Sequence, residues 1–348
     1  MLTDTNNHLP LLSLAGSAYD IGVQLGRHGA RSVHGYLKKT QAWATVINQR
    51  NCLIVEAAKT AVAQRYPTYL QELQGLSEGL ELPFDDVFAW NCRGDVWAMA
   101  PDGCTTVQMP GPEPIVAHNE DGDPGLRGGC AIVRVTPNIG KAYSAFVYPA
   151  SIPGHTFAVN ENGLVLTVNN IRSQASGQGL PRMILTRAIL DCGSVDEAAS
   201  LISKSKRAGA FHLTLACAGD ARIVGVEFTH KACSVHTIGV QSVHANHLVH
   251  DGMHGEAQII TGSSQSRQCC GDRILARTTH MTDPMAILWD QQNEALPVYR
   301  DQPDDPDDEN TLATAVFEIK SDNVAWRVYD RAYALPRFSF EEAVIISV

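Results

Sequence analysis

Asp102-Gly103-Cys104-Thr105-Thr106 is the stretch from which the fold and the chemistry of this chain can be read. Gly103 has no side chain to hinder an approach to its carbonyl, and it can adopt backbone angles that other residues resist. Attack by the Cys104 thiol on that carbonyl would give a thioester, which water can open. Cys104 would then be a new N-terminus. Its α-amine, with a reference pKa of about 7.7–8.0, suits general-base catalysis near neutral pH.

The pentapeptide alone also fits a small core side chain, since free cysteine is among the most buried residue types. Together with Asn119-Glu120-Asp121, however, Gly-Cys-Thr-Thr resembles the isopenicillin N acyltransferase / carcinine hydrolase family of self-cleaving N-terminal nucleophile hydrolases. The resemblance covers most of the chain and weakens towards its C-terminus. It implies one domain over residues 1–348, cut between Gly103 and Cys104 into a small subunit, 1–103, and a large subunit, 104–348.

The pattern of the chain changes at Cys104. Before it, we predict a helix that Ser17 or Asp20 caps, a long helix over 35–65, and helices in the segments 69–80 and 84–91. After it, short β-rich runs alternate with turns. One is a hairpin over 157–170 around Asn162-Gly163, and a helix pair lies at 182–203. The residues alone indicate the α+β class. The resemblance implies a four-layer αββα sandwich.

Composition limits the classes of function. The 348 residues carry a net charge of -10 without Lys/Arg clusters, which argues against a nucleic-acid partner. No apolar run approaches the roughly 20 residues of a membrane span, and we recognise no secretory signal. The nine cysteines lack the spacing of a disulfide framework, so we expect reduced thiols and a cytoplasmic location. No cofactor is implied, and a homo-oligomer is compatible with the sequence.

Asp121 follows the first hairpin after Cys104. A strand that begins at Cys104 and a partner that ends near Asp121 would bring the two together, because antiparallel neighbours return to the same end. A plain turn residue is the alternative, since Asp121-Gly122-Asp123-Pro124-Gly125 is rich in turn signals. By resemblance, Asp121 orients the N-terminal amine and Asn119 sits beside it.

The stretch His244-Ala245-Asn246-His247 supplies a second candidate group. An amide offers two N–H donors, which suits an oxyanion hole, and the resemblance gives Asn246 this role. We expect His247 to support it through hydrogen bonds. Asn170 resembles a further recurrent amide of related hydrolases, although Asn169 fits the same place.

A zinc site is the rival interpretation of the histidines in this region, which are His244, His247, His250 and His254. No Glu follows His244 in the metalloprotease pattern, and the context reads as a strand end rather than a helix. We therefore expect no metal.

Arginines and acidic residues bear on the substrate. Glu120 and Asp123 could hold an ammonium group. Arg93 fits a structural charge partner for Asp95 or Asp102 better than a binding group. The acidic stretch 301–309 reads as a solvated surface loop.

The penicillin acyltransferase of this family carries a Ser-Arg pair near its C-terminal strands. The matching place here is Thr311-Leu312, so that arginine is missing, and Arg267 or Arg93 could replace it. This departure argues against a penicillin substrate.

Three functions therefore compete. The first is a self-processing cysteine amidohydrolase acting on a small amide, such as a β-alanyl amide of the carcinine type. The second is an N-acyltransferase that uses an acyl-coenzyme A, as in the isopenicillin N / 6-aminopenicillanic acid reaction. The third is an unprocessed, inactive homologue with a binding role.

Overall fold

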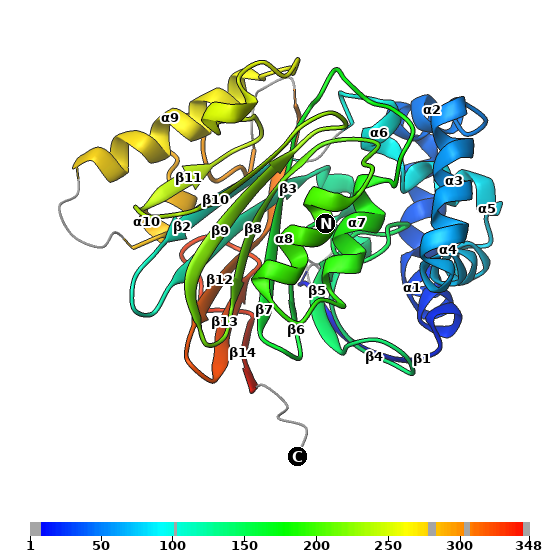
Figure 1. Ribbon diagram of the computed structural model, residues 1–348, viewed down its shortest axis with the longest axis horizontal. Helices are drawn as coiled ribbons and strands as arrows, with labels where there is room; N and C mark the ends of the chain where they lie inside the picture. The colour runs from blue at the N-terminus through cyan, green and yellow to red at the C-terminus, as the bar shows by residue number, and fades with distance from the viewer. Residues whose placement is uncertain (1–7, 101–102, 278–282, 303–306, 344–348) are drawn as a thin grey trace, which may run out of the picture.

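The computed structural model describes residues 8–100, 103–277, 283–302 and 307–343 (Figure 1). Helices dominate before Cys104 and strands after it. The helices are α1 (Ala18–Gly35), α2 (Gln41–Ile47), α3 (Leu53–Arg65), α4 (Pro67–Leu80), α5 (Phe84–Trp90), α6 (Arg93–Val96), α7 (Arg182–Ile189), α8 (Val195–Lys204), α9 (Gly262–Arg277) and α10 (Met285–Leu288), with 3₁₀ turns η1 (Leu37–Lys39), η2 (Pro124–Gly129) and η3 (Asp251–Met253). Within these described residues, none of the helices is both long and apolar enough to cross a membrane.

The strands of the described segments form two sheets. The eight-stranded sheet has the order β1-β4-β5-β6-β7-β8-β9-β10, and the six-stranded sheet the order β11-β2-β3-β12-β13-β14. Their bounds are β1 (Leu11–Gly16), β2 (Gly103–Met109), β3 (Ile115–Gly122), β4 (Ala131–Pro137), β5 (Tyr143–Val147), β6 (Phe157–Asn160), β7 (Leu164–Asn170), β8 (Phe211–Cys217), β9 (Asp220–Phe228), β10 (Cys233–Thr237), β11 (Ser242–His244), β12 (Asn310–Ile319), β13 (Asn323–Tyr329) and β14 (Phe338–Ala343). Neighbouring strands within these two sheets run antiparallel, except for β1 and β4, which run parallel.

The two sheets face each other, and β2 contacts β7 across the gap. Gln108 on β2 donates a hydrogen bond of 2.7 Å to the Thr214 hydroxyl on β8. Helices α1 and α8 pack on the eight-stranded sheet, and α9 and α10 on strands β11, β2 and β3 of the other. Figure 1 shows the two groups of helices on opposite sides of the strands. The α+β class is confirmed.

Helices α1 and α4 approach closely because glycines line their contact. A Cβ on Gly22 would lie 2.0 Å from the Glu72 carbonyl oxygen, and one on Gly75 would lie 2.0 Å from that of Tyr19. Ser17 caps α1 in a capping box with Asp20, as the sequence predicts.

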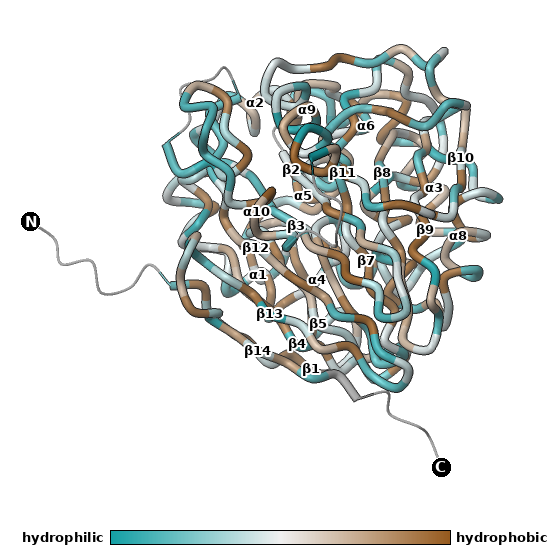
Figure 2. The backbone as a smooth tube through the Cα atoms, turned by 90° about the vertical axis from the view of Figure 1, so that its left-hand side faces the viewer, coloured by the Kyte–Doolittle hydropathy of each residue, from teal (hydrophilic) through white to brown (hydrophobic). Residues whose placement is uncertain are grey.

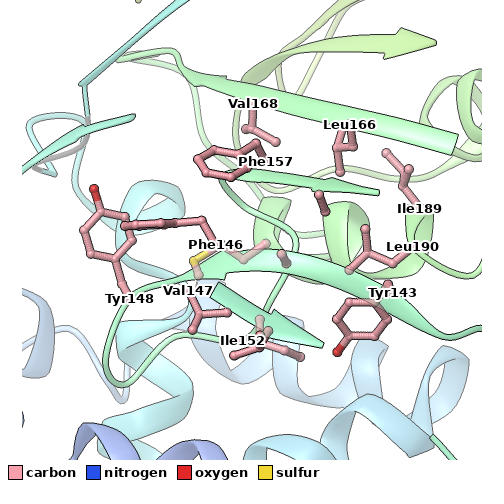
Figure 3. Close-up of a cluster of buried hydrophobic side chains, with 14 of the residues drawn as sticks. Tyr143, Phe146, Val147, Tyr148, Ile152, Phe157, Leu166, Val168, Ile189 and Leu190 are labelled. Carbon is pink, nitrogen blue, oxygen red and sulfur yellow. The ribbon is translucent and has the colours of Figure 1, made fainter. Parts of the chain in front are cut away.

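Buried apolar side chains from the helices and from both sheets form one large cluster. Figure 2 shows brown, hydrophobic stretches along the inner strands and teal, hydrophilic ones at many of the loops. Figure 3 shows part of the cluster. Phe146 and Phe157 come from the neighbouring strands β5 and β6 of the eight-stranded sheet, and Ile189 and Leu190 from the end of α7 lie near Leu166 and Tyr143. This packing fixes the sheet that faces Cys104.

Two expectations are wrong. The segment 35–65 is not one helix but η1, α2 and α3, because Thr40 caps α2 with a hydrogen bond to the Trp43 amide and Cys52 begins a new helix. The acidic stretch 301–309 is not fully solvated: Glu309 is 1% exposed and pairs with Arg300. The hairpin 157–170 is confirmed, with Gly163 at a φ of +71° in its turn.

Candidate active site around Cys104

Cys104 lies at the start of β2, where β2 pairs with the end of β3. Gly103 is opposite Asp121, and Cys104 is opposite Glu120. The proximity expected from an antiparallel return is therefore present. Because side chains alternate along a strand, Cys104 and Glu120 share one face of the sheet, and Asp121 points to the other.

The backbone of Cys104 is held on both sides. Its N–H donates to Asn246 Oδ1 at 2.9 Å, and its carbonyl accepts a hydrogen bond from Arg267 Nη1. Arg267 also donates to Thr105 Oγ1 at 2.9 Å and to Asn246 Oδ1 at 2.8 Å. Arg267 comes from α9 and is fully buried. Its guanidinium therefore connects α9 to the Cys104 carbonyl and to the Asn246 oxygen that accepts from the Cys104 N–H.

Asn246 is itself fixed by the groups around it. Its Nδ2 donates to the Asn170 carbonyl at 3.0 Å, and its backbone N–H donates to Ser264 Oγ at 2.9 Å. His247 Nδ1 bonds to the same Ser264 oxygen at 2.8 Å. Burial lowers the His247 pKa to about 4, so the ring is neutral at pH 7. The carbonyl oxygen of the Asn246 amide, rather than its nitrogen, faces Cys104.

Asp121 has one bound and one unbound carboxylate oxygen. Thr311 on β12 donates to Oδ1 at 2.7 Å. Oδ2 is buried and has no hydrogen-bond partner among the described residues. A buried carboxylate oxygen without a donor is costly, which indicates a place for a cation or an N–H group. Thr311 lies opposite Asp121 in the pairing of β12 with β3 and fixes one side of this carboxylate.

A carboxyl group lies against Gly103. A Cβ at this position would be 2.2 Å from Glu309 Oε2, so a larger residue at 103 would require the Glu309 carboxylate to move. Glu309 accepts a hydrogen bond from Arg300 at 2.9 Å and lies 3.6 Å from Arg172. Burial raises the pKa of Glu309 to about 7, against the opposing effect of the two arginines.

The thiol side of Cys104 holds a separate group. Sγ lies 3.9 Å from Glu120 Oε2, and the same oxygen lies 3.1 Å from His118 Nε2. Thiol, carboxylate and imidazole are within 4.8 Å of one another, a spacing that one metal ion could also bridge. The direct hydrogen bonds between them account for the arrangement without an ion.

The other predicted residues have structural partners. Asn119 donates to the Leu288 carbonyl at 2.6 Å and accepts from Thr314 at 2.7 Å, which ties β3 to α10 and β12. Asn170 accepts from Arg182 at 2.6 Å through its side chain. Arg93 is buried, with its guanidinium 5.2 Å from the Trp90 ring centroid. Asp102 lies outside the described residues.

The histidines of 244–254 do not converge. His244 bonds to Glu227 at 2.8 Å and stacks on His212, with ring centroids 3.4 Å apart. His250 bonds to Ser234 at 3.2 Å, and His254 is exposed beside Asp251. The stretch follows β11 as a strand end, as expected, rather than lying on a helix.

The Cys104 thiol is closed off from solvent. Cys104 is 2% exposed, and Glu120, Asp121 and Asn246 are at most 1% exposed. A large hollow of about 710 Å³ lies elsewhere, between α3 and α8, and none of the candidate catalytic residues lines it.

Sequence reasoning missed His118 and Thr106. Both carry a signal in hindsight, because they lie two residues from Glu120 and Cys104 on strands and so share their face. Glu309 gave no such signal, since only the fold brings it to Gly103.

Comparison with known proteins connects this geometry to a family. The model of the family "Acyl-coenzyme A:6-aminopenicillanic acid acyl-transferase" matches residues 108–332. Beta-alanyl-dopamine/carcinine hydrolase of Drosophila melanogaster is 23% identical over 221 residues, which cover 55% of this chain and 56% of that enzyme. The 40 kDa form of the acyl-coenzyme A:6-aminopenicillanic-acid-acyltransferase of Emericella nidulans is 25% identical over 296 residues, covering 82% of this chain and 80% of the relative. The match to the fly protein thus spans little more than half its length.

Proposed function

Because the chain belongs to the acyl-coenzyme A:6-aminopenicillanic acid acyl-transferase family, we propose that it is a cysteine enzyme that cuts itself before Cys104 and then acts on the C–N bond of a small linear amide. The observation that carries the proposal is the pair of hydrogen bonds that fixes the backbone of Cys104. Asn246 holds the Cys104 N–H and Arg267 holds its carbonyl, so the scissile bond is fixed beside a buried thiol.

Self-cleavage would begin with attack of Sγ on the Gly103 carbonyl. The C–N bond breaks, the Cys104 nitrogen takes a proton and becomes an amine, and a thioester joins Gly103 to Sγ. Water then opens the thioester and leaves a Gly103 carboxylic acid and a free thiol. Burial of the thiol favours this route over an immediate reaction with an outside amide, because no substrate reaches Sγ before the cut.

The new α-amine of Cys104 is the base of the mature enzyme in this proposal. It takes the thiol proton as Sγ attacks the substrate carbonyl and returns it to the leaving amine. The unpaired Oδ2 of Asp121 suits the orientation of that amine, with Thr311 fixing the carboxylate. Arg267 carries N–H donors beside Cys104 that would stabilise the oxyanion, and Asn246 would add one once its amide, whose oxygen now accepts from the Cys104 N–H, turns its nitrogen towards the site.

Water is the acceptor that we favour, with a β-alanyl amide of the carcinine type as substrate. The similarity to an enzyme named for carcinine and β-alanyl-dopamine supports this choice. Acyl transfer from a coenzyme A thioester is the second candidate, supported by the longer match to the fungal acyltransferase. An unprocessed binding protein has less support, since it leaves the geometry around Cys104 unexplained.

We also propose a fold type and a domain organisation for the chain. Two facing sheets with helices on opposite sides support a four-layer αββα sandwich of the N-terminal nucleophile type. The shared hydrophobic cluster supports one domain over 1–348, which cleavage would divide into 1–103 and 104–348 without separating the halves.

The test is release of amine and acid from a panel of β-alanyl and fatty-acyl amides, without coenzyme A. A parallel reaction offers 6-aminopenicillanic acid and an acyl-coenzyme A. We expect free acid from a β-alanyl amide, and none with Cys104→Ala. Steady acyl transfer to the penicillin nucleus, with no hydrolysis anywhere in the panel, would favour the acyltransferase instead.

A further inference from the structure

A line of polar contacts runs inward from the Cys104 thiol between the two sheets. Sγ contacts Glu120 Oε2 at 3.9 Å, and that oxygen contacts His118 Nε2 at 3.1 Å. His118 Nδ1 lies 2.8 Å from Thr106 Oγ1, which donates to Asn169 Oδ1 at 2.7 Å. All five side chains are buried, so no bulk water supplies or removes protons along this line.

The protons along this line can be counted. Asn169 Nδ2 donates to the His244 carbonyl at 3.0 Å, so Asn169 Oδ1 must be an acceptor. The Thr106 hydroxyl donates its one proton to that oxygen. In its contact with His118 it must therefore accept, and His118 Nδ1–H is the donor. In a neutral His118, Nε2 is then a bare acceptor facing a carboxylate oxygen. The contact between His118 and Glu120 needs one further proton, which the two residues share.

We infer that Glu120, fixed by His118, is the base that removes the Cys104 thiol proton during self-cleavage. The inference rests on the proposed cut between Gly103 and Cys104. It concerns the one chemical step for which the mature enzyme's base does not exist, because the Cys104 nitrogen is still part of a peptide bond. Asp121 is not placed to act here, since it points to the opposite face of the sheet from the thiol.

The proton transfers balance over the reaction. Glu120 Oε2 takes the proton from Sγ while the shared proton moves fully to His118 Nε2, and Sγ attacks the Gly103 carbonyl carbon. When the Gly103–Cys104 C–N bond breaks, Glu120 gives its proton to the departing nitrogen and His118 returns the shared one. Water then hydrolyses the thioester, so the sum is one peptide bond and one water consumed.

His118 also favours the second half of this cycle. Burial lowers its pKa to about 3, so its protonated form is a strong acid. Protonated His118 therefore returns the shared proton readily when Glu120 gives its own proton to the departing nitrogen. His118 acts through Glu120 and is a positioning residue.

The decisive variant of the full-length chain is Glu120→Gln. The proton count requires a donor towards His118 Nε2, and a glutamine amide supplies one at the same size, so the fold should persist. Glutamine cannot take the thiol proton. We expect self-cleavage after cell-free synthesis to slow by about 10²-fold or more. Glu318→Gln, which removes a carboxylate from β12 of the same sheet, should cleave at the parental rate.

Hydroxylamine separates the base from a later role, because it traps a thioester as a Gly103 hydroxamate. Parent chains should yield the hydroxamate, and in Glu120→Gln chains hydroxamate and cleavage product should both form about 10²-fold more slowly. Trapping or cleavage of Glu120→Gln at the parental rate would overturn the inference while leaving self-cleavage intact. A parent that never cleaves would overturn the proposed function and this inference together.

Three further measurements test for a folding defect, for the role of His118 and for a metal ion. Glu120→Asp keeps a carboxylate at a longer distance and should cleave slowly and still trap. His118→Gln retains an acceptor for Glu120 and should cleave faster than His118→Phe, and equal rates in the two would remove His118 from the step. If a chelator abolished cleavage of the parent chain, a metal ion rather than Glu120 would activate the thiol, and the inference would be wrong.

Discussion

Arg267 joins three parts of the candidate site through one side chain. It binds the Cys104 carbonyl, the Thr105 hydroxyl and the Asn246 amide oxygen from a fully buried position. From the sequence, Arg267 and Arg93 were the two candidates to replace the arginine of the Ser-Arg pair, which this chain lacks near its C-terminal strands. The geometry supports that choice over Arg93, which packs on Trp90.

Arg267→Lys tests this assignment. A lysine cannot donate in two directions from a fixed plane, so Cys104 and Asn246 would not both be held. We expect self-cleavage and amide turnover each to fall by about 10–10²-fold, measured by denaturing gel and by amine release. Arg273→Lys on the same helix is the matched control and should match the parent, since Arg273 contacts Cys270 instead.

At the scale of elements, the α1–α4 contact depends on glycine. Gly75→Ala would push a methyl group into the Tyr19 carbonyl, a backbone atom that cannot rotate away. We expect a loss of about 1–3 kcal/mol in the free energy of unfolding, measured with urea. Gly35→Ala in α1 meets nothing within 4 Å and should be neutral or gain up to about 1 kcal/mol. Equal stability of the two variants would contradict the close approach.

Local signals predicted the elements that local chemistry decides. Ser17 began α1, and Asn162-Gly163 made a hairpin, because a cap and a turn are each encoded within a few residues. The breaks within 35–65 were missed, since no glycine or proline marks them. The burial of Glu309 was missed because its partners Arg172 and Arg300 reach it through tertiary contacts.

In the candidate site, too, some features could be predicted from local sequence and others depend on tertiary contacts. Cys104 and Asp121 could be paired from the sequence, since one antiparallel return brings them together. The direction of the Asn246 amide could not, because it depends on Asn170 and Arg267 from other elements.

Across the whole molecule, buried histidines link stability to pH. Burial lowers the pKa of His212 well below its ordinary value, and that of His250 to about 4. Both are neutral in the folded chain, whereas the unfolded chain takes up protons below a pH of about 6.5. Their stabilisation is therefore complete above that pH and is lost as the pH falls from about 6.5 towards 4, by up to about 1.4 kcal/mol per unit for each ring.

Urea unfolding at pH 7.5, 5.5 and 4.5 measures this dependence. His212→Gln should flatten the slope between pH 6.5 and 4.5, while the same change at the exposed His254 should leave it as it is. A parental stability that stays constant down to pH 4.5 would contradict the linkage.

Mass spectrometry of the freshly purified, active protein under denaturing conditions tests the central claim most directly. Self-cleavage predicts two chains, the larger covering residues 104–348 with an N-terminus of Cys-Thr-Thr-Val, and a single chain for Cys104→Ala. A fully active enzyme that remains one polypeptide of 348 residues would contradict the account.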